Sequence, residues 1–154
     1  MRAVIQRVSA AQVISDGVLT GKINKGLAIF LGVKKGDGRE DAEALAAKIG
    51  KLRIFRDENE KMNLSVADIG GEAIVVSNFT LCANYAHGNR PDYFGAEEPE
   101  RANELYGYFV GELKKYISHV DTGVFGADMK YTVENDGPIT IIMDSEVLLK
   151  KEIR

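Results

Sequence analysis

The sequence has 154 residues, a formal net charge of −3 at pH 7, one cysteine, two histidines and no tryptophan. This length suits a single domain over residues 1–154, because a chain of about 150 residues buries roughly two-thirds of its unfolded surface in one core. The single cysteine, Cys82, excludes an internal disulfide, and with two histidines it is too few for a standard zinc site. We therefore expect no metal and no cofactor.

Charge and hydropathy exclude two further classes of protein. No run approaches the 18 apolar residues that a membrane span needs, and Arg2 and Arg7 interrupt the N-terminal apolar pattern too early for a secretory signal. The sequence predicts a soluble cytoplasmic protein with no membrane partner. Its negative net charge argues against bulk coating of nucleic acid. Residues 1–61 nevertheless carry a net charge of +4 and residues 62–154 one of −7, so a local, salt-sensitive contact with phosphates stays open.

The first half of the chain predicts a hairpin, a central strand and a helix. An Asp-Gly dipeptide separates two β-rich runs, residues 2–15 and 18–23, and suits a tight turn because glycine accepts positive φ. Residues 27–33 form a nearly unbroken apolar run, which is typical of a central strand. Over residues 40–51 apolar side chains recur at helical spacing, with Asp37 as the N-cap or a near-cap.

The second half predicts another core strand, the longest helix and a return to strands. Residues 72–77 form an apolar strand, and a helix follows over residues 99–119, with a proline in its first turn where a missing N–H costs no helical bond. Three further strands are expected over residues 120–125, 129–134 and 139–143. The predicted class is α+β, with a mainly antiparallel, curved sheet covered by two long helices.

Two short segments stand where an apolar, strand-like run meets a polar loop, which is where functional sites commonly lie. The first is Ser77–Leu81 and the second is Asn135–Thr140. In the second segment Gly137 has no Cβ and Pro138 has a fixed φ and no N–H, so we expect a stiff turn with exposed carbonyl oxygens. Two interpretations stay open: an ordinary hairpin turn, and a rigid corner that probes the shape of a ligand.

The common catalytic signatures are absent, because the sequence has no G-x-S-x-G, H-E-x-x-H or Walker motif. His87 and His119 are candidate bases, but a lone histidine is more often structural, and Cys82 has no base or cation beside it in the sequence. Thr80 is the remaining hydroxyl candidate. A threonine hydroxyl after a strand usually bonds the local backbone, so the backbone N–H groups of Phe79 and Thr80 are better candidates for an oxyanion hole.

The chain strongly resembles the D-aminoacyl-tRNA deacylases, formerly called D-tyrosyl-tRNA deacylases, nearly from end to end. Several spaced motifs carry the resemblance in one order: residues 1–8, 26–33, 52–55, 61–63, 77–81, 88–91, 122–129 and 135–140. The family signature usually reads Ser-Gln-Phe-Thr, and here Asn78 replaces the glutamine with a shorter amide. The family also commonly has a basic residue where His87 stands.

The resemblance implies a homodimeric hydrolase. Its substrate would be the ester between a D-amino acid, or glycine mischarged on tRNA-Ala, and the 3′ end of tRNA. Gly137-Pro138 would be a cis peptide inserted into the partner's pocket, where it leaves no room for an L side chain. Backbone N–H groups would hold the substrate carbonyl, and hydroxyls would order the loop, which assigns catalysis to Phe79, Thr80 and Ser77. The residues expected to bind substrate and select its chirality are Gly137, Pro138, Asn78, Asn135, Thr140 and Met129.

Several alternatives stay open at this level. The attacking water needs a base, and two roles compete: the ribose 2′-OH of the substrate, which we prefer, and Thr80 as a covalent nucleophile. The chain could instead be a noncatalytic module that binds the tRNA end, or an esterase for small D-amino esters. We expect the amino acid side chain to face solvent or a roomy cleft, because a check on handedness must tolerate many side chains.

Overall fold

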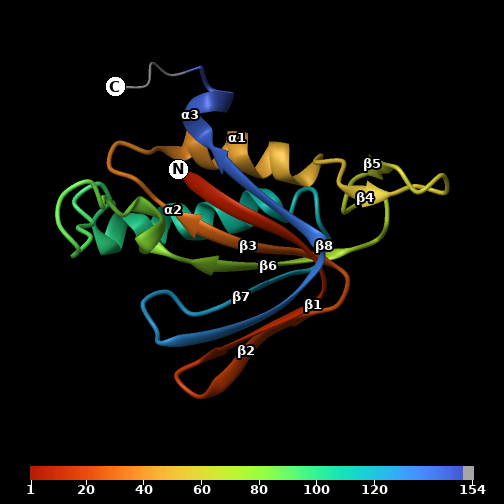
Figure 1. Cartoon of the computed structure of the whole chain (residues 1–154), viewed down its shortest axis with the longest axis horizontal. Coiled ribbons are helices and arrows are strands. Elements are labelled where there is room, and N and C mark those ends of the chain that lie inside the picture. The colour runs from red at the N-terminus through yellow and green to blue at the C-terminus, as the bar shows by residue number, and fades with distance from the viewer. Residues whose placement is uncertain (151–154) are drawn as a thin grey trace.

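The computed structural model describes residues 1–150, which form a curved six-stranded sheet, a small two-stranded sheet and helices that cover the large sheet (Figure 1). The order of the large sheet is β2-β1-β3-β6-β7, and β8 pairs with β1. The strands are β1 (Arg2–Ser15), β2 (Val18–Ile23), β3 (Gly26–Gly32), β4 (Phe55–Arg56), β5 (Met62–Leu64), β6 (Glu72–Ser77), β7 (Val120–Thr122) and β8 (Met129–Asp144). The helices are α1 (Arg39–Gly50), the 3-10 turn η1 (Phe79–Cys82), α2 (Pro99–Leu113) and α3 (Ser145–Leu148).

The first two strands form the predicted hairpin. β1 and β2 pair antiparallel, with Ser15 opposite Val18. The turn between them has positive φ at Asp16 (47°) and Gly17 (82°). Positive φ at both central residues suits the right-handed twist of the flanking strands, so the prediction made from the Asp-Gly dipeptide is confirmed.

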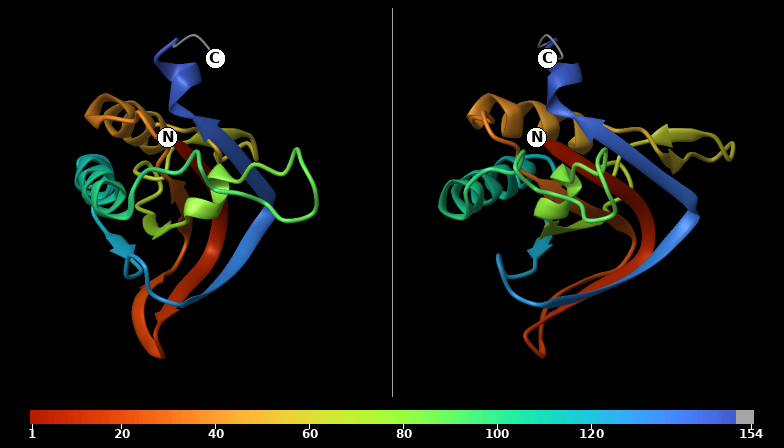
Figure 2. Two further views of the ribbon diagram at one scale, coloured as in Figure 1. Left: turned by 90° about the vertical axis from the view of Figure 1, so that its left-hand side faces the viewer. Right: turned by 60° about the vertical axis from the view of Figure 1, so that its left-hand side comes forward.

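The large sheet curves around β1. Residues Arg2–Val8 of β1 pair with β3, residues Ala11–Ser15 pair with β2, and β8 pairs with β1 along nearly all of its length. Register shifts in the β1–β8 ladder mark bulges, which bend strands, and both views of Figure 2 show the resulting curve. The three ladders of β1 are antiparallel, whereas β3–β6 and β6–β7 are parallel, so the sheet is curved as predicted but mixed.

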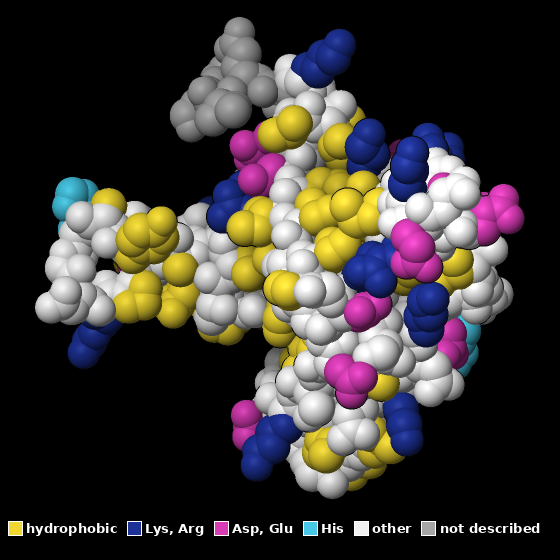
Figure 3. Space-filling view, turned by 45° about the vertical axis from the view of Figure 1, so that its right-hand side comes forward, with side chains coloured by type: hydrophobic (Ala, Val, Ile, Leu, Met, Phe, Trp, Pro, Cys, Tyr) yellow, Lys and Arg dark blue, Asp and Glu magenta, His cyan; other side chains and the backbone are white. Residues whose placement is uncertain are grey.

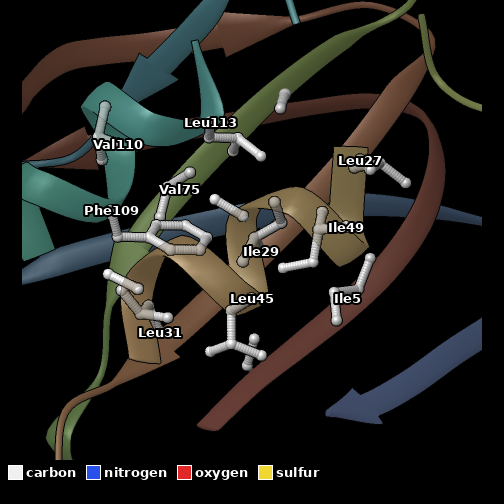
Figure 4. Packing of buried hydrophobic residues seen from close by; sticks show 14 of the residues in the cluster. Ile5, Leu27, Ile29, Leu31, Leu45, Ile49, Val75, Phe109, Val110 and Leu113 are labelled. Carbon is white, nitrogen blue, oxygen red and sulfur yellow. The ribbon is translucent and has the colours of Figure 1, made fainter. Parts of the chain in front are cut away.

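The main core lies between the sheet and the helices α1 and α2 (Figure 4). Ala3 and Ile5 alternate into it from β1, and Leu45 and Ile49 of α1 belong to the same cluster. Phe109 of α2 is fully buried there, and burial of one such side chain stabilises the fold by about 1.5–3 kcal/mol. A smaller cluster lies elsewhere along the strands and contains Val8, Ala11, Val13, Ile23, Ala28, Ile74 and Val76. No helix within residues 1–150 is long and apolar enough to cross a membrane.

Helix α2 ends earlier than its apolar pattern predicts. It stops at Leu113 rather than near His119. In the turn that follows, the N–H groups of Lys115 and Tyr116 donate to carbonyl oxygens three residues earlier, at Glu112 and Leu113, instead of four. Ile117 still packs in the core at 1% exposure, which explains why the apolar spacing continues beyond the helix. The strand expected over residues 120–125 is likewise shorter, since β7 ends at Thr122.

Asp37 is not the N-cap of α1 but lies one residue before it, so of the two predicted positions only the near-cap one is confirmed. Gly38 occupies the cap position. The carboxylate of Asp37 instead accepts hydrogen bonds from the Met1 ammonium group and from the Lys34 N–H. The Asp37 side chain, which the local pattern places at the N-terminus of the helix, therefore forms an ion pair with a residue that is distant in the sequence.

The interpretation of Gly137-Pro138 as an ordinary hairpin turn is also wrong. β8 is one long strand, and its parts before and after the Gly-Pro peptide both pair with β1 rather than with each other. Asn135 lies opposite Val8 and Thr140 lies opposite Gln6, so the four residues 136–139 bulge out opposite a single residue of β1. The segment is a corner that interrupts one continuous strand.

Candidate active site

A cavity of about 700 Å³ opens beside the C-terminal end of β6. It is bounded by β3 and β6, by the turn η1, by the segment that leads into α2, and by the chain between β7 and β8. Its walls are largely apolar, and the aromatic residues among them are Phe30, Phe79, Tyr93, Phe94, Phe125 and Tyr131. A space of this size and character is typical of a small-molecule or nucleotide site.

The cavity exists because β7 stops before β6 does. β7 pairs only with Ala73–Val75, while β6 continues to Ser77. Beyond Thr122 the chain departs from the sheet and returns at Met129 in β8, and residues from this detour line the cavity. The end of β6 is thus paired with β3 on one edge and has no neighbouring strand on the other edge, where the cavity lies.

The backbone of Ser77 faces this open edge. The N–H of Asn78 donates to the carbonyl oxygen of Leu31 at 2.8 Å, which directs the backbone of Asn78 toward β3. In a strand the backbone groups of neighbouring residues point to opposite edges. The N–H and C=O of Ser77 therefore point to the side where β7 has ended, so that a donor and an acceptor stand next to each other on the cavity wall.

The turn η1 carries the predicted oxyanion donors. Asn78 caps it: its side-chain oxygen accepts the Thr80 N–H at 3.2 Å and also accepts the Thr80 hydroxyl. Phe79 supplies the first N–H of the turn, which has no partner inside a helical turn. The Phe79 ring is 59% exposed and makes an edge contact with Tyr93, with 5.1 Å between the ring centroids. The Phe79 donor is therefore open, whereas Asn78 occupies the Thr80 donor.

The Gly137-Pro138 corner is held by a buried arginine. The peptide bond is cis, and Gly137 has a φ of +129°. Arg7 of β1 is 3% exposed and donates through Nη1 to the carbonyl oxygen of Ile54 (2.9 Å) and through Nε to that of Asp136 (3.2 Å). The Arg7 Nε also lies 3.4 Å from the Asp136 carboxylate. A Cβ on Gly137 would come within 3.2 Å of Arg7 Nη2, so glycine permits this close approach.

Asn135 and Thr140 close the two ends of the same bulge. The Asn135 amide donates to Thr140 Oγ1 at 2.9 Å and accepts the Ile139 N–H at 3.2 Å. Gln6 of β1 donates to the same Thr140 oxygen at 3.3 Å. Both side chains are therefore engaged with the corner itself, which they hold in shape.

The structure divides the predicted site residues into two groups. The residues that line the cavity are Ser77, Asn78, Phe79 and Met129. Thr80 is the residue after Phe79 in η1. The other group lies on the bulge of β8, away from the cavity lining, and consists of Asn135, Gly137, Pro138 and Thr140. Gly137 and Pro138 are exposed to solvent.

The cavity offers shape and hydrogen bonds rather than a strong base. Within residues 1–150 no histidine or cysteine lines it, and the carboxylates on its walls are Glu98 and Glu97, of which Glu97 pairs with Arg101. His119 lies near the opposite end of β6, with Nε2 at 3.0 Å from the Asp121 carboxylate and 3.4 Å from Glu72. Half-buried Cys82 is a poor nucleophile, because desolvation raises the pKa of its thiol and keeps it protonated. Burial likewise raises the pKa of the Tyr131 phenol, which stays neutral.

Sequence reasoning missed the roles of Arg7, Tyr93 and Phe94. Sequence reasoning treats Arg7 only as a charge that interrupts the N-terminal apolar pattern. Its place on the inward face of β1, in step with Ala3 and Ile5, signals a buried cation. A cation on an otherwise apolar face needs acceptors nearby. Tyr93 and Phe94 carry no such periodic signal, because they lie in an irregular segment before α2.

Comparisons with known proteins point to one family. The family model described as "D-Tyr-tRNA(Tyr) deacylase" matches residues 4–144. The chain is 58% identical to a D-aminoacyl-tRNA deacylase of Persephonella marina over 96% of this chain and all of that protein. It is 56% identical to the same-named protein of Aquifex aeolicus over 94% of this chain and 98% of the relative.

Solved structures show the same architecture. A structure titled "c-Myc DNA Unwinding Element Binding Protein" is 37% identical and superposes with a TM-score of 0.88 over 94% of this chain and 98% of that chain. A probable eukaryotic D-amino acid tRNA deacylase, 16% identical, shares the fold with a TM-score of 0.74 over 93% of this chain and 98% of that chain. The family model and the identity over nearly the full length place this chain in the D-Tyr-tRNA deacylase family.

Proposed function

We propose that this chain is a D-aminoacyl-tRNA deacylase, which hydrolyses the ester between a D-amino acid and the 3′-terminal ribose of tRNA and spares the L ester. Relatives that are 48–58% identical over at least 94% of this chain carry this name. The place of action would be the cytoplasm, where charged tRNA is found. Glycyl-tRNA-Ala would be a second substrate, because glycine has no side chain for a steric filter to reject.

The cavity suits the terminal nucleoside of the substrate. Single-stranded RNA ends are commonly recognised by aromatic side chains that stack on bases, and six aromatic residues line this space. The adjacent N–H and C=O of Ser77 match the donor and acceptor on the edge of a purine. A base held there would bring its ribose and the ester on it toward the first turn of η1.

The Phe79 N–H is the donor best placed for the ester carbonyl. It is open at the start of η1, and a fixed donor that meets the developing oxyanion accounts for about 10²–10³ in rate in other hydrolases. Thr80 is a poor covalent nucleophile, because its hydroxyl donates to the Asn78 amide, which is not a base. The ribose 2′-OH would then activate the water, so a substrate with a 2′-deoxy terminal ribose should lose far more turnover than Thr80→Val.

A second copy of the chain would complete the site. The observation that carries this step is that the Gly137-Pro138 corner is held rigidly by Arg7 yet lies exposed and away from the cavity of its own chain. A two-fold contact, the commonest symmetry of protein oligomers, would place each corner at the other chain's cavity. Large exposed apolar side chains are available for such a contact: Tyr85 and Phe94 are 83% and 79% exposed. Figure 3 shows hydrophobic side chains, in yellow, on the part of the protein that projects at the left of the view and on the adjacent body.

The function is tested with matched D-Tyr-tRNA and L-Tyr-tRNA and purified protein. We expect the D ester to be hydrolysed at least about 100-fold faster, because a rigid wall rejects an L side chain more strongly than attractive contacts can. Equal rates on the two enantiomers would refute selection of chirality. Binding of charged tRNA without release of amino acid would favour a noncatalytic module that binds the tRNA end. Hydrolysis of small D-amino esters as fast as that of D-Tyr-tRNA would favour an esterase for small molecules.

The shared site is tested by mixing two inactive variants. Phe79→Pro removes the backbone donor, and Gly137→Phe places a ring where the corner would enter the partner's cavity. If sites are shared, a mixed dimer has one intact site, and statistical mixing should restore about one quarter of the wild-type activity. No recovery in mixed dimers demonstrated by native mass spectrometry, or full activity from a proven monomer, would rule this arrangement out.

A further inference from the structure

One cation on the cavity wall has no role in the chemistry proposed above. Among the lining residues of the described chain, Lys35 is the only lysine or arginine. It is exposed, and it forms no salt bridge within residues 1–150. Its neighbour Lys34 differs, because the Lys34 Nζ lies 3.3 Å from the Asp144 carboxylate and 3.5 Å from that of Glu146. The ammonium group of Lys35 is therefore available to a ligand, whereas that of Lys34 is engaged.

The backbone that carries Lys35 is fixed on two sides. The Lys35 N–H donates to the carbonyl oxygen of Gly95 at 2.9 Å. The Asp37 N–H donates to the carbonyl oxygen of Lys34 at 3.1 Å, which closes a turn with Lys35 and Gly36 at its centre. Gly36 has a φ of +88°, as the third position of a type II turn requires. The Lys35 side chain thus extends from a rigid base.

Lys35 is also close to the turn η1. The end of β3 touches η1, because a Cβ on Gly32 would come within 3.0 Å of the Leu81 Cβ and 3.1 Å of the Asn78 carbonyl oxygen. Lys35 follows Gly32 by three residues, so the two Cα atoms are at most about 11 Å apart. The lysine side chain is long and flexible, which extends the reach of its charge. One bound nucleotide can therefore contact both η1 and this cation.

A phosphate is the anion of the proposed substrate that matches this cation. The terminal nucleotide of tRNA carries a single negative charge, on the phosphodiester that joins it to the preceding nucleotide. Because the rest of the tRNA is attached through this phosphodiester, it must lie at the mouth of the cavity, where exposed Lys35 stands. Lysine commonly binds phosphate as a point charge. The wall carboxylates Glu97 and Glu98 form no salt bridge with Lys35 within residues 1–150, and Glu97 already pairs with Arg101 at 3.5 Å.

We propose that Lys35 forms a phosphate subsite at the mouth of the cavity and binds the last phosphodiester of the tRNA 3′ end. This step rests on the proposed function, since it places an RNA end in the cavity. The phosphodiester does not change in the reaction, so its contact with Lys35 contributes equally to the ground state and the transition state. Free nucleotides also carry a phosphate on a nucleoside, and the experiment must separate them from an RNA end.

The subsite is tested by equilibrium binding of adenosine, 5′-AMP and the RNA trinucleotide CCA, none of which has an ester to hydrolyse. Lys35→Gln should weaken CCA binding about 3–10-fold at low salt and leave adenosine binding unchanged. The slope of log affinity against log salt concentration for CCA should become shallower by about 0.7, the value for one phosphate contact on a single strand. Lys25→Gln is the matched control, because exposed Lys25 precedes the opposite end of β3. It should leave the affinity and the slope as in the wild type.

Hydrolysis gives a second measurement. D-Tyr-tRNA contains the phosphodiester, and D-tyrosyl-adenosine does not. Lys35→Gln should raise the KM for D-Tyr-tRNA about 3–10-fold with kcat changed less than about 2-fold, and should leave kcat/KM for D-tyrosyl-adenosine unchanged. Lys35→Arg keeps the charge and should keep nearly the wild-type KM.

Three results would overturn the proposal. One is an equal loss of affinity for adenosine and CCA in Lys35→Gln, which would indicate a general change in the cavity. Another is an unchanged salt slope. The third is tighter binding of 5′-AMP than of CCA, which would indicate a site for free nucleotides. Because binding is measured without hydrolysis, a Lys35-dependent affinity for CCA would stand even if D-Tyr-tRNA were not hydrolysed. Conversely, normal hydrolysis of D-Tyr-tRNA with an unchanged KM in Lys35→Gln would refute the subsite and leave the proposed function intact.

Discussion

The two candidate functional segments of this protein, Ser77–Leu81 and Asn135–Thr140, are held in place in opposite ways. The turn after β6 is held largely by neighbours in the sequence, since Asn78 binds both the N–H and the hydroxyl of Thr80. The corner of β8 is held from afar, by Arg7, which is 129 residues away from Asp136. The turn lines the cavity of its own chain, and the corner does not.

This difference separates two requirements of the proposed reaction. A donor for the ester carbonyl needs only a short, locally stable turn at the end of a strand. A filter for handedness needs a surface that does not yield, and a buried guanidinium that bonds two carbonyl oxygens supplies that stiffness. Changes in the turn should therefore affect rate, whereas changes around Arg7 should affect selectivity and stability.

The largest effect on rate is expected from Phe79→Pro. Proline removes the open backbone donor, yet it is tolerated at the first position of a helical turn, and Asn78 already has the extended backbone (φ −147°, ψ 93°) that a following proline requires. We expect kcat for D-Tyr-tRNA to fall by about 10²–10³ with little change in the unfolding midpoint. Phe79→Leu keeps the N–H and loses the ring contact with Tyr93, so it should retain most of the activity. Similar rates for the two variants would show that this donor is not used.

Arg7→Met should have the next largest effect, and this effect should be on stability and on the preference for the D ester rather than on kcat. Methionine fills a similar volume but leaves the carbonyl oxygens of Ile54 and Asp136 without their donor. We expect a loss of about 2–4 kcal/mol, which lowers the unfolding midpoint by roughly 5–15 °C. The preference for the D ester should fall by about 10-fold or more as the corner loosens.

Arg53→Met is the matched control for that change, because the Arg53 side chain is exposed and donates to the carbonyl oxygen of Asn63, far from the corner. It should leave selectivity unchanged. Arg7→Lys keeps the charge but not the planar fork, and should restore only part of the selectivity. A selectivity that stays at the wild-type value in Arg7→Met would contradict the role assigned to the arginine.

The smallest effects are expected from Asn78→Ala and Thr80→Val. Each removes the same contact, the bond from the Thr80 hydroxyl to the Asn78 oxygen, and loss of a cap costs about 0.5–2 kcal/mol. We expect each to lower kcat by about 3–10-fold, and the double variant to be little worse than either single one. Strict additivity in kcat would show that the two side chains act separately, and complete inactivity of Thr80→Val would support the rival role of Thr80 as nucleophile.

The sequence by itself determined the features that depend on neighbouring residues. Strand alternation, the Asp16-Gly17 turn and the helical spacing behind Gly38 are local patterns, and each gives the element that it predicts. The spaced motifs, from Ser77–Leu81 to Asn135–Thr140, also place the chain in its family. Local chemistry likewise marks the turn after β6, where a polar segment follows an apolar strand.

Only the tertiary structure decided which distant residues meet. The cavity opens because β7 ends at Thr122 while β6 continues to Ser77. The sequence pattern of one strand does not predict how far the neighbouring strand extends. Arg7 holds the corner because the sheet curves and β8 bulges opposite it. The Asp37 carboxylate binds the Met1 ammonium group at 2.8 Å rather than the N-terminus of α1, because the fold brings these two residues together. Periodicity and turn chemistry act over a few residues, whereas burial and charge pairing are settled by the folded arrangement of the whole chain.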